Sequence, residues 1–130
     1  LKTDRNIRFV VKEFPILGEA SLISSKFAIA VKNIGGPEEY KFVHDILLTL
    51  TAEPSEAYLR RIATELQLDP EELFSAMESE PVLQEISQTS ELAKKLQIGG
   101  TPTFIFEEQV LRGFVPLDVL LQVAETVRKK

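Results

Sequence analysis

The fold of this chain is decided by the stretch Ile98-Gly99-Gly100-Thr101-Pro102-Thr103-Phe104. The glycine pair ends a helical pattern, and the proline precedes a short apolar strand that we predict over Thr103–Phe106. The stretch Gln109–Arg112 can pair with that strand as a β-hairpin. A tight two-residue turn favours Asn-Gly or another pair with glycine, but Glu107-Glu108 stands there, so we predict a longer or looser turn.

The segment after the hairpin predicts a closing helix. Gly113 to Pro116 forms a turn, and apolar residues then recur at helical spacing. The residues expected on the buried side of this helix are Leu117, Leu120, Leu121, Ala124 and Val127.

The residues before Gly99 predict one strand followed by several helices. Ile7–Phe14 is rich in β-branched and aromatic residues, which favours a strand. Further along, apolar residues recur at helical spacing between glycine and proline breaks. Ser55 is a candidate N-cap. Asp69-Pro70 is the clearest helix start, because aspartate can cap and proline fits the first turn. The predicted helices begin near Glu19, Pro37, Ser55, Pro70 and Pro81.

The composition limits what the chain can do. Its 130 residues suffice for one domain with one core. The net charge of −5 argues against a nucleic-acid or anionic-membrane surface, because phosphate binding needs a basic face. No apolar run reaches the roughly 18 residues of a membrane span. With no cysteine and a single histidine, His44, these residues offer no thiol nucleophile and no histidine-rich metal site. We expect neither a metal nor a cofactor.

Three stretches, taken in order, resemble the DsbA-like proteins of the bacterial envelope. They are Lys12–Gly18, Tyr40–Leu47, and Ile98–Phe104 followed by Leu111–Asp118. The resemblance covers nearly all of the chain. It implies an α/β, thioredoxin-like fold of the DsbA type with a helical insertion. On this view residues 1–130 form a single domain, in which 1–18 and 99–130 are the thioredoxin-like part and 19–98 are mainly the helical insert.

The resemblance also implies where a substrate binds. In DsbA-like proteins the Thr-Pro-Thr segment is a cis-proline loop beside a C-x-x-C pair at a helix start. The helix N-terminus lowers the pKa of the first cysteine, whose thiolate exchanges with a substrate disulfide. We therefore expect a cis bond between Thr101 and Pro102, and we expect these two residues to bind the substrate chain. No catalytic residue lies in this chain, because the C-x-x-C pair is absent.

The same resemblance places the first strand of the fold, and the start of the active-site helix, upstream of Leu1. That strand would lie between Ile7–Phe14 and Thr103–Phe106, so its loss leaves a gap of roughly 9–10 Å, or two strand spacings. Buried main-chain groups without partners cost about 1–3 kcal/mol each. We expect a further segment, a neighbouring chain in a homo-oligomer or strand exchange, or a rearranged sheet to fill the gap.

The function implied is part of a periplasmic or envelope thiol–disulfide oxidoreductase or isomerase, redox-inactive without its cysteines. Its partners would be extended, cysteine-containing substrates and a redox partner protein. Two alternatives stay open. The first is a non-redox peptide-binding or assembly module on the same fold. The second is an enzyme of the kappa-class glutathione transferase or DsbA-like isomerase type, although Arg112–Asp118 fits disulfide exchange better.

Other polar residues are interpreted as structural. His44 is taken as a helix residue rather than a proton carrier, because no obvious partner accompanies it. Lys12 and Glu13 are taken to mark a strand edge rather than to tune a thiol. We interpret a cluster of three acidic residues as solvated helix ends rather than as a cation site; these are Glu78, Glu80 and Glu85.

Overall fold

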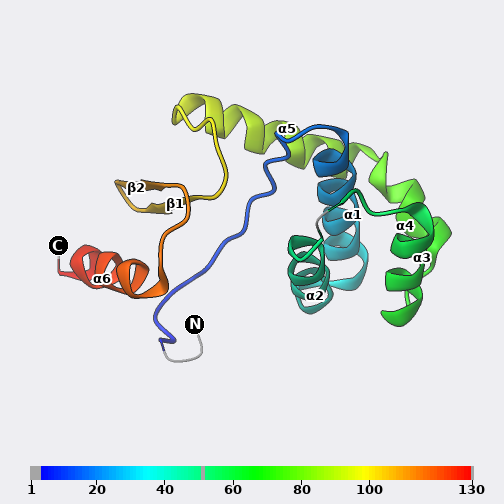
Figure 1. Cartoon of the computed structure of the whole chain (residues 1–130), viewed down its shortest axis with the longest axis horizontal. Coiled ribbons are helices and arrows are strands. Elements are labelled where there is room, and N and C mark those ends of the chain that lie inside the picture. The colour runs from blue at the N-terminus through cyan, green and yellow to red at the C-terminus, as the bar shows by residue number, and fades with distance from the viewer. Residues whose placement is uncertain (1–3, 51, 130) are drawn as a thin grey trace. The chain divides into compact units, whose positions relative to one another are not determined.

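The computed structural model describes residues 4–50 and 52–129 (Figure 1). These residues fall into two compact units, divided between Ser90 and Glu91 within one long helix. We call them the helical unit, up to Ser90, and the hairpin unit, from Glu91. The predicted layout of one domain, with an insert over residues 19–98, stays a prediction. No helix among the described residues is long and apolar enough to cross a membrane.

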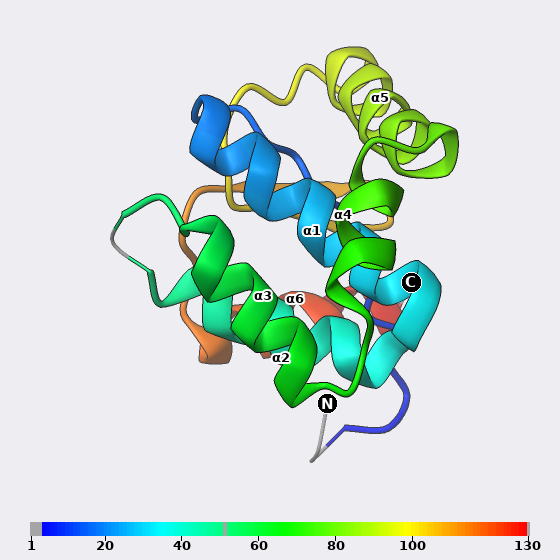
Figure 2. The same ribbon diagram turned by 90° about the vertical axis from the view of Figure 1, so that its right-hand side faces the viewer.

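The helical unit consists of short helices that begin close to the predicted positions. Its central helix, α1, packs against α2 and α4, and α3 packs against α4 (Figure 2). Two predicted caps are confirmed: Ser55 Oγ accepts a hydrogen bond from the Tyr58 N–H at 3.1 Å, and Asp69 Oδ1 accepts one from the Glu71 N–H at 3.0 Å. The helices are α1 (Glu19–Gly35), α2 (Pro37–Leu48), α3 (Glu56–Glu65), α4 (Pro70–Met77) and α5 (Glu80–Lys95).

The core of the helical unit is centred on α1. Residues 27–31 of this helix are all buried. This part of α1 is therefore enclosed on all sides, whereas a surface helix buries only one face. Phe27 contacts Phe74 of α4 with ring centroids 6.3 Å apart. Leu59 of α3 and Leu73 of α4 are at most 1% exposed and complete the packing.

The predicted strand Ile7–Phe14 is wrong. Residues 7–14 form neither a helix nor a strand, and Phe9 and Val10 are 60% and 56% exposed. A strand forms by pairing its main chain with a second strand, and the other regular elements of the helical unit are all helices. The apolar composition therefore produces an extended segment that has no partner strand among the described residues.

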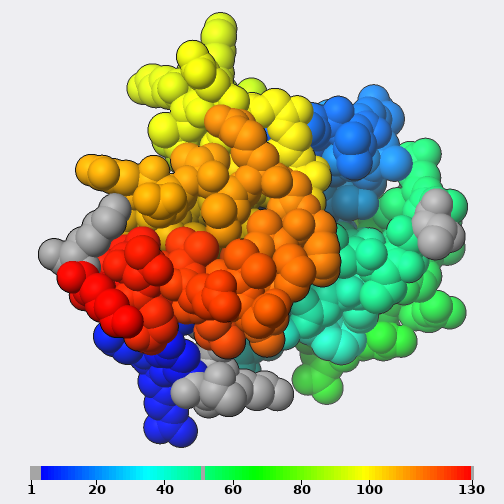
Figure 3. Space-filling model, turned by 60° about the vertical axis from the view of Figure 1, so that its left-hand side comes forward, coloured from blue at the N-terminus to red at the C-terminus, as the bar shows by residue number. Residues whose placement is uncertain are grey.

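The hairpin unit contains the last part of α5, the strands β1 (Thr103–Phe106) and β2 (Gln109–Arg112), and α6 (Leu117–Arg128). The strands are antiparallel, as predicted, and α6 packs on β1. Figure 3 shows a face on which the atoms of the hairpin and α6 gather, in orange and red. Two residues predicted on the buried side of α6 are instead exposed, Leu117 at 68% and Leu121 at 37%.

The predicted loose turn of the hairpin is also wrong. Phe106 pairs with Gln109, so only Glu107 and Glu108 remain for the turn. Glu107 adopts a φ of 51°, in the left-handed region, which costs a residue with a side chain about 1–2 kcal/mol. Strand pairing determines the register, because it places the apolar residues Phe104 and Leu111 opposite each other. The turn then has only two residues, whatever their own preference.

Candidate functional site

The Thr101-Pro102 loop lies between the end of α5 and the start of β1 (Figure 1). The peptide bond between the two residues is cis, and both residues are exposed. The Pro102 carbonyl oxygen accepts a hydrogen bond from the Gly113 N–H at 2.9 Å. Thr103 Oγ1 donates to the Gly100 carbonyl oxygen at 2.8 Å. The loop is thus held by hydrogen bonds on both sides of Thr101, which remains open to solvent.

The main chain of Thr101 is available to a partner. Within the part of the chain that the structure describes, nothing forms a hydrogen bond with its N–H or C=O. Alternate residues of an antiparallel strand point their main-chain groups to opposite sides. The Pro102 carbonyl faces β2, where it accepts the Gly113 hydrogen bond. The main-chain N–H and C=O groups of Thr103 and Ile105 therefore face the opposite side of β1, where no described strand pairs with them. An extended chain can add to such an edge.

The connection from β2 to α6 contains an exposed aromatic residue directly after Gly113, the residue that bonds to Pro102. Phe114 follows Gly113 directly and is 85% exposed. The sequence pattern did not predict Phe114 as a site residue. The signal that could have identified it is its position between Gly113 and Pro116, where no strand or helix pattern buries it. Exposure alone does not mark Phe114 as a site residue, because isolated exposed apolar residues are common. Phe114 is a candidate because it follows the residue that bonds to Pro102.

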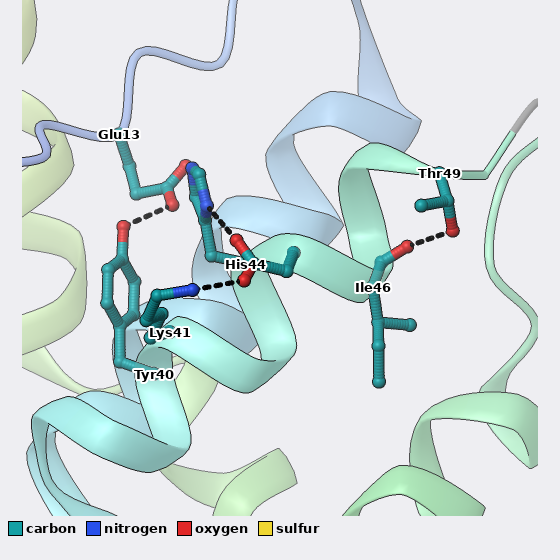
Figure 4. A network of polar contacts seen from close by, with 7 residues as sticks. Glu13, Tyr40, Lys41, His44, Ile46 and Thr49 are labelled. Atoms are coloured by element: carbon teal, nitrogen blue, oxygen red, sulfur yellow. Dashed lines mark hydrogen bonds and ion pairs between the residues drawn. The ribbon is translucent and has the colours of Figure 1, made fainter. Parts of the chain in front are cut away.

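A second polar cluster lies in the helical unit (Figure 4). The Glu13 carboxylate accepts hydrogen bonds from the Tyr40 hydroxyl at 2.7 Å and from Ser25 Oγ at 3.0 Å. Burial raises the pKa of Tyr40 well above its ordinary value, and the hydrogen bond to Glu13 raises it further. Tyr40 therefore keeps its proton and acts as a donor. These bonds fasten the extended segment before α1 to α1 and α2.

His44 lies at the edge of this cluster and behaves as a helix residue. Its Nδ1 is 3.5 Å from Asp45 Oδ1, and its ring centroid is 5.8 Å from that of Tyr40. Lys41 Nζ contacts the same carboxylate at 2.5 Å, and this hydrogen bond lowers the pKa of Asp45. Asp45 is thus a neighbour of His44 that the sequence pattern did not indicate (Figure 4), and the structural role of His44 stays a prediction.

The acidic residues near the start of α5 form ion pairs with α1. Glu78 contacts Lys26 at 3.1 Å, and Glu85 contacts Lys32 at 2.7 Å. These pairs join helices that are distant in sequence, so the carboxylates already have cationic partners. Across the described residues, no group of three or more metal-ligating side chains comes together.

The predicted site residues are divided between the two units. Thr101 and Pro102 belong to the hairpin unit, whereas Lys12, Glu13 and His44 belong to the helical unit. Residues 7–14 form no strand, so the interpretation of Lys12 and Glu13 as a strand edge is wrong. Glu13 instead accepts hydrogen bonds from Ser25 and Tyr40. The substrate-binding role of Thr101 and Pro102 stays a prediction.

Comparison with known proteins identifies the family. The DSBA-like thioredoxin domain family matches residues 1–124. A search of curated proteins finds no match. A thioredoxin-like oxidoreductase from Silicibacter pomeroyi DSS-3 is similar in structure, with a TM-score of 0.88 and 36% identity. The match covers 99% of this chain and 73% of that protein.

Two further solved structures are similar. The thiol-disulfide exchange protein alpha-DsbA2 from Wolbachia pipientis has a TM-score of 0.80 and 27% identity, over 89% of this chain and 63% of that one. ScsC from Proteus mirabilis has a TM-score of 0.83 and 21% identity, over 99% and 70% of the respective chains, and this likeness concerns the fold alone. The predicted DsbA-type, thioredoxin-like fold with a helical insertion is confirmed. The chain belongs to the family of DSBA-like thioredoxin domains.

Proposed function

We propose that this chain is the substrate-binding and scaffold part of a bacterial envelope thiol–disulfide oxidoreductase or isomerase that acts on cysteines of exported proteins. The observation that carries the proposal is the family match over residues 1–124. The exposed Thr101, whose main chain has no partner among the described residues, supports it. The chain has no cysteine, so the 130 residues alone are redox-inactive and the reactive thiols come from residues outside them.

The chemistry is an exchange between a dithiol and a disulfide. In the oxidising direction, a substrate thiolate attacks one sulfur of the enzyme disulfide and forms a mixed disulfide, while the second enzyme sulfur leaves as a thiolate. A second substrate thiolate then attacks the substrate sulfur of that bond. The substrate gains a disulfide, and the enzyme leaves as a dithiol. A redox partner protein reoxidises the enzyme by the same exchange.

The task of the hairpin unit is to hold the substrate chain in place during this exchange. The open main chain of Thr101 pairs with an extended substrate segment, a short form of β-augmentation. Pro102 forms the wall of the site, and Phe114 offers an apolar surface one residue beyond Gly113. The outer edge of β1 takes a further strand, supplied by another segment of the protein or by a second copy.

The proposal is tested with the full-length natural protein, a variant with its cysteines changed to serine, and the 130-residue chain. The measurement is the rate at which a reduced, unfolded secreted protein regains its disulfides in a glutathione buffer. Only the cysteine-containing full-length protein should accelerate this reaction. A natural protein that has no cysteine, or whose cysteines give no acceleration in either the oxidation or the reshuffling assay, contradicts the proposal.

A non-redox peptide-binding module is the second candidate, favoured by the absence of cysteine together with the open main chain at Thr101. In this case the protein grips extended clients without changing their disulfides. The same cysteine-to-serine variant distinguishes the two candidates. Suppression of client aggregation by that variant, at the level of the wild type, favours the binding module. Loss of the effect together with the thiols favours the enzyme.

A further inference from the structure

The end of α5 is closed by its own main-chain hydrogen bonds. The Ile98 N–H donates to the Ala93 carbonyl at 2.8 Å, and the Gln97 N–H donates to the Lys94 carbonyl at 3.2 Å. Gln97 has a φ of 57°, in the left-handed region. This is the Schellman motif, in which a left-handed residue ends the helix and the freed carbonyls find new donors. The helix end itself needs no further partner.

The same motif ends α3 and provides an internal comparison. The Leu68 N–H donates to the Ala63 carbonyl at 2.9 Å, and the Gln67 N–H donates to the Thr64 carbonyl at 3.0 Å. Gln67 has a φ of 60°. Within the described residues no side chain bonds to the Gln67 carbonyl. The Leu66-Gln67-Leu68 ending therefore adopts this turn without a hydrogen bond from a side chain.

At α5 an additional bond is present. Arg112 Nη1 donates to the Gln97 carbonyl oxygen at 2.9 Å. Arg112 is the last residue of β2, and the N–H of the next residue, Gly113, holds the Pro102 carbonyl. Two successive residues, Arg112 and Gly113, thus bond to the two ends of the loop that runs from Gln97 to Pro102. The open main chain of Thr101 lies between these two ends in the sequence.

We propose that Arg112 is a positioning residue for the Thr101-Pro102 loop. By fixing the Gln97 carbonyl, it sets the path of the main chain that presents Thr101 to a substrate. This inference rests on the proposed function, since it concerns how the same loop meets the substrate chain. A guanidinium suits the task because it offers several N–H donors in a rigid plane.

The test uses the full-length protein with its cysteines. Arg112→Met removes the donor and keeps an apolar stem, Arg112→Lys keeps a charged donor, and Arg61→Met is the matched control on the surface of α3. The measurements are kcat and KM with an extended peptide that contains one disulfide, the pKa of the reactive thiol, and the melting temperature. We expect Arg112→Met to raise KM about threefold to tenfold, the range of one lost solvent-exposed hydrogen bond, with kcat and the thiol pKa unchanged. Arg112→Lys should recover most of the wild-type KM, and Arg61→Met should have the wild-type KM.

The possible results separate this inference from the function on which it rests. If the wild-type protein exchanges disulfides but Arg112→Met has the wild-type KM, the positioning role is wrong and the proposed function stands. If Arg112→Met and Arg112→Lys impair KM equally, the guanidinium has another role and the inference is overturned. If the wild type shows no exchange, both proposals fall. Should Arg112→Met not fold, Arg112→Leu, which also has no side-chain donor, serves in its place with the same expected rise in KM.

Discussion

The main-chain N–H of Gly113 donates a hydrogen bond of 2.9 Å to the carbonyl oxygen of Pro102. This bond continues the β1–β2 ladder by one step beyond Thr103 and Arg112, which are the last paired residues of the two strands. It therefore fixes the proline of the loop to the end of β2. The conformation of Gly113 is part of this arrangement, because its φ of 87° lies where residues with a side chain rarely go.

We expect Gly113→Ala to destabilise the protein by about 1–2 kcal/mol through the backbone alone. A methyl group at this position meets nothing within 4 Å, so no steric clash contributes. Gly99→Ala is the matched control, because it too has open space within 4 Å but does not have a left-handed φ. Urea denaturation should show the loss for Gly113→Ala only. Equal effects at the two glycines would contradict the backbone argument.

Tyr40→Phe should cost about 1.5–3 kcal/mol near neutral pH, because it removes a hydrogen bond to the charged Glu13 side chain. Tyr58→Phe is the control, since within the described residues the Tyr58 hydroxyl has no hydrogen-bond partner. Chemical denaturation of both variants measures the difference. A similar loss of stability in the two variants would show that the Glu13 bond is not the cause.

The Tyr40 effect should also depend on pH at the alkaline end. Burial, followed by the hydrogen bond to Glu13, raises the pKa of Tyr40 in the folded protein above the value of about 10 in an unfolded chain. The stability that Tyr40 contributes is therefore complete below about pH 10 and declines as the pH rises beyond it. Denaturation curves at pH 8 and pH 11 should show a smaller gap between wild type and Tyr40→Phe at the higher pH. A stability difference that is larger at pH 11 than at pH 8 would contradict the predicted direction.

Leu73→Ala should destabilise the protein by about 2–5 kcal/mol, because this side chain is fully buried in the helical unit and its loss leaves a cavity. Leu48→Ala removes the same atoms from a side chain that is 72% exposed, so we expect a change near zero. Thermal and urea denaturation of the pair check this. An equal loss of stability in the two variants would contradict the placement of Leu73 in the core.

Phe114→Ala should weaken substrate binding without weakening the fold. The side chain is 85% exposed, so its removal should leave the stability of the protein almost unchanged. If a substrate covers part of the ring, KM for a cysteine-containing peptide should rise about threefold to tenfold, a fraction of the burial energy of phenylalanine. Leu48→Ala, an exposed apolar change in the helical unit, should not alter KM. An unchanged KM in Phe114→Ala would remove this residue from the site.

Local signals predicted most of the elements, because each depends on neighbours in the sequence. Ser55 and Asp69 cap the helices that follow them, and the hairpin strands have the predicted bounds. The errors arose where distant partners decide the structure. Ile7–Phe14 has strand composition but no partner strand among the described residues, and the ladder forces a two-residue turn on Glu107-Glu108.

The candidate site was predictable only in part, for the same reason. Thr101 and Pro102 stand out in the sequence because of the glycines before them and the strand after them. The Glu13–Tyr40 hydrogen bond joins residues 27 positions apart, and the Arg112–Gln97 bond joins residues 15 apart. Pairs at such separations follow from the folded arrangement, which local patterns do not contain.

The central claim is that an extended substrate chain binds to the main chain of Thr101. The most direct measurement is amide hydrogen exchange of the full-length protein, free and trapped as a mixed disulfide with a cysteine-containing peptide. The Thr101 N–H has no partner among the described residues, so it should exchange rapidly in the free protein and become protected in the mixed disulfide. Continued rapid exchange at Thr101 in the trapped complex would contradict the account.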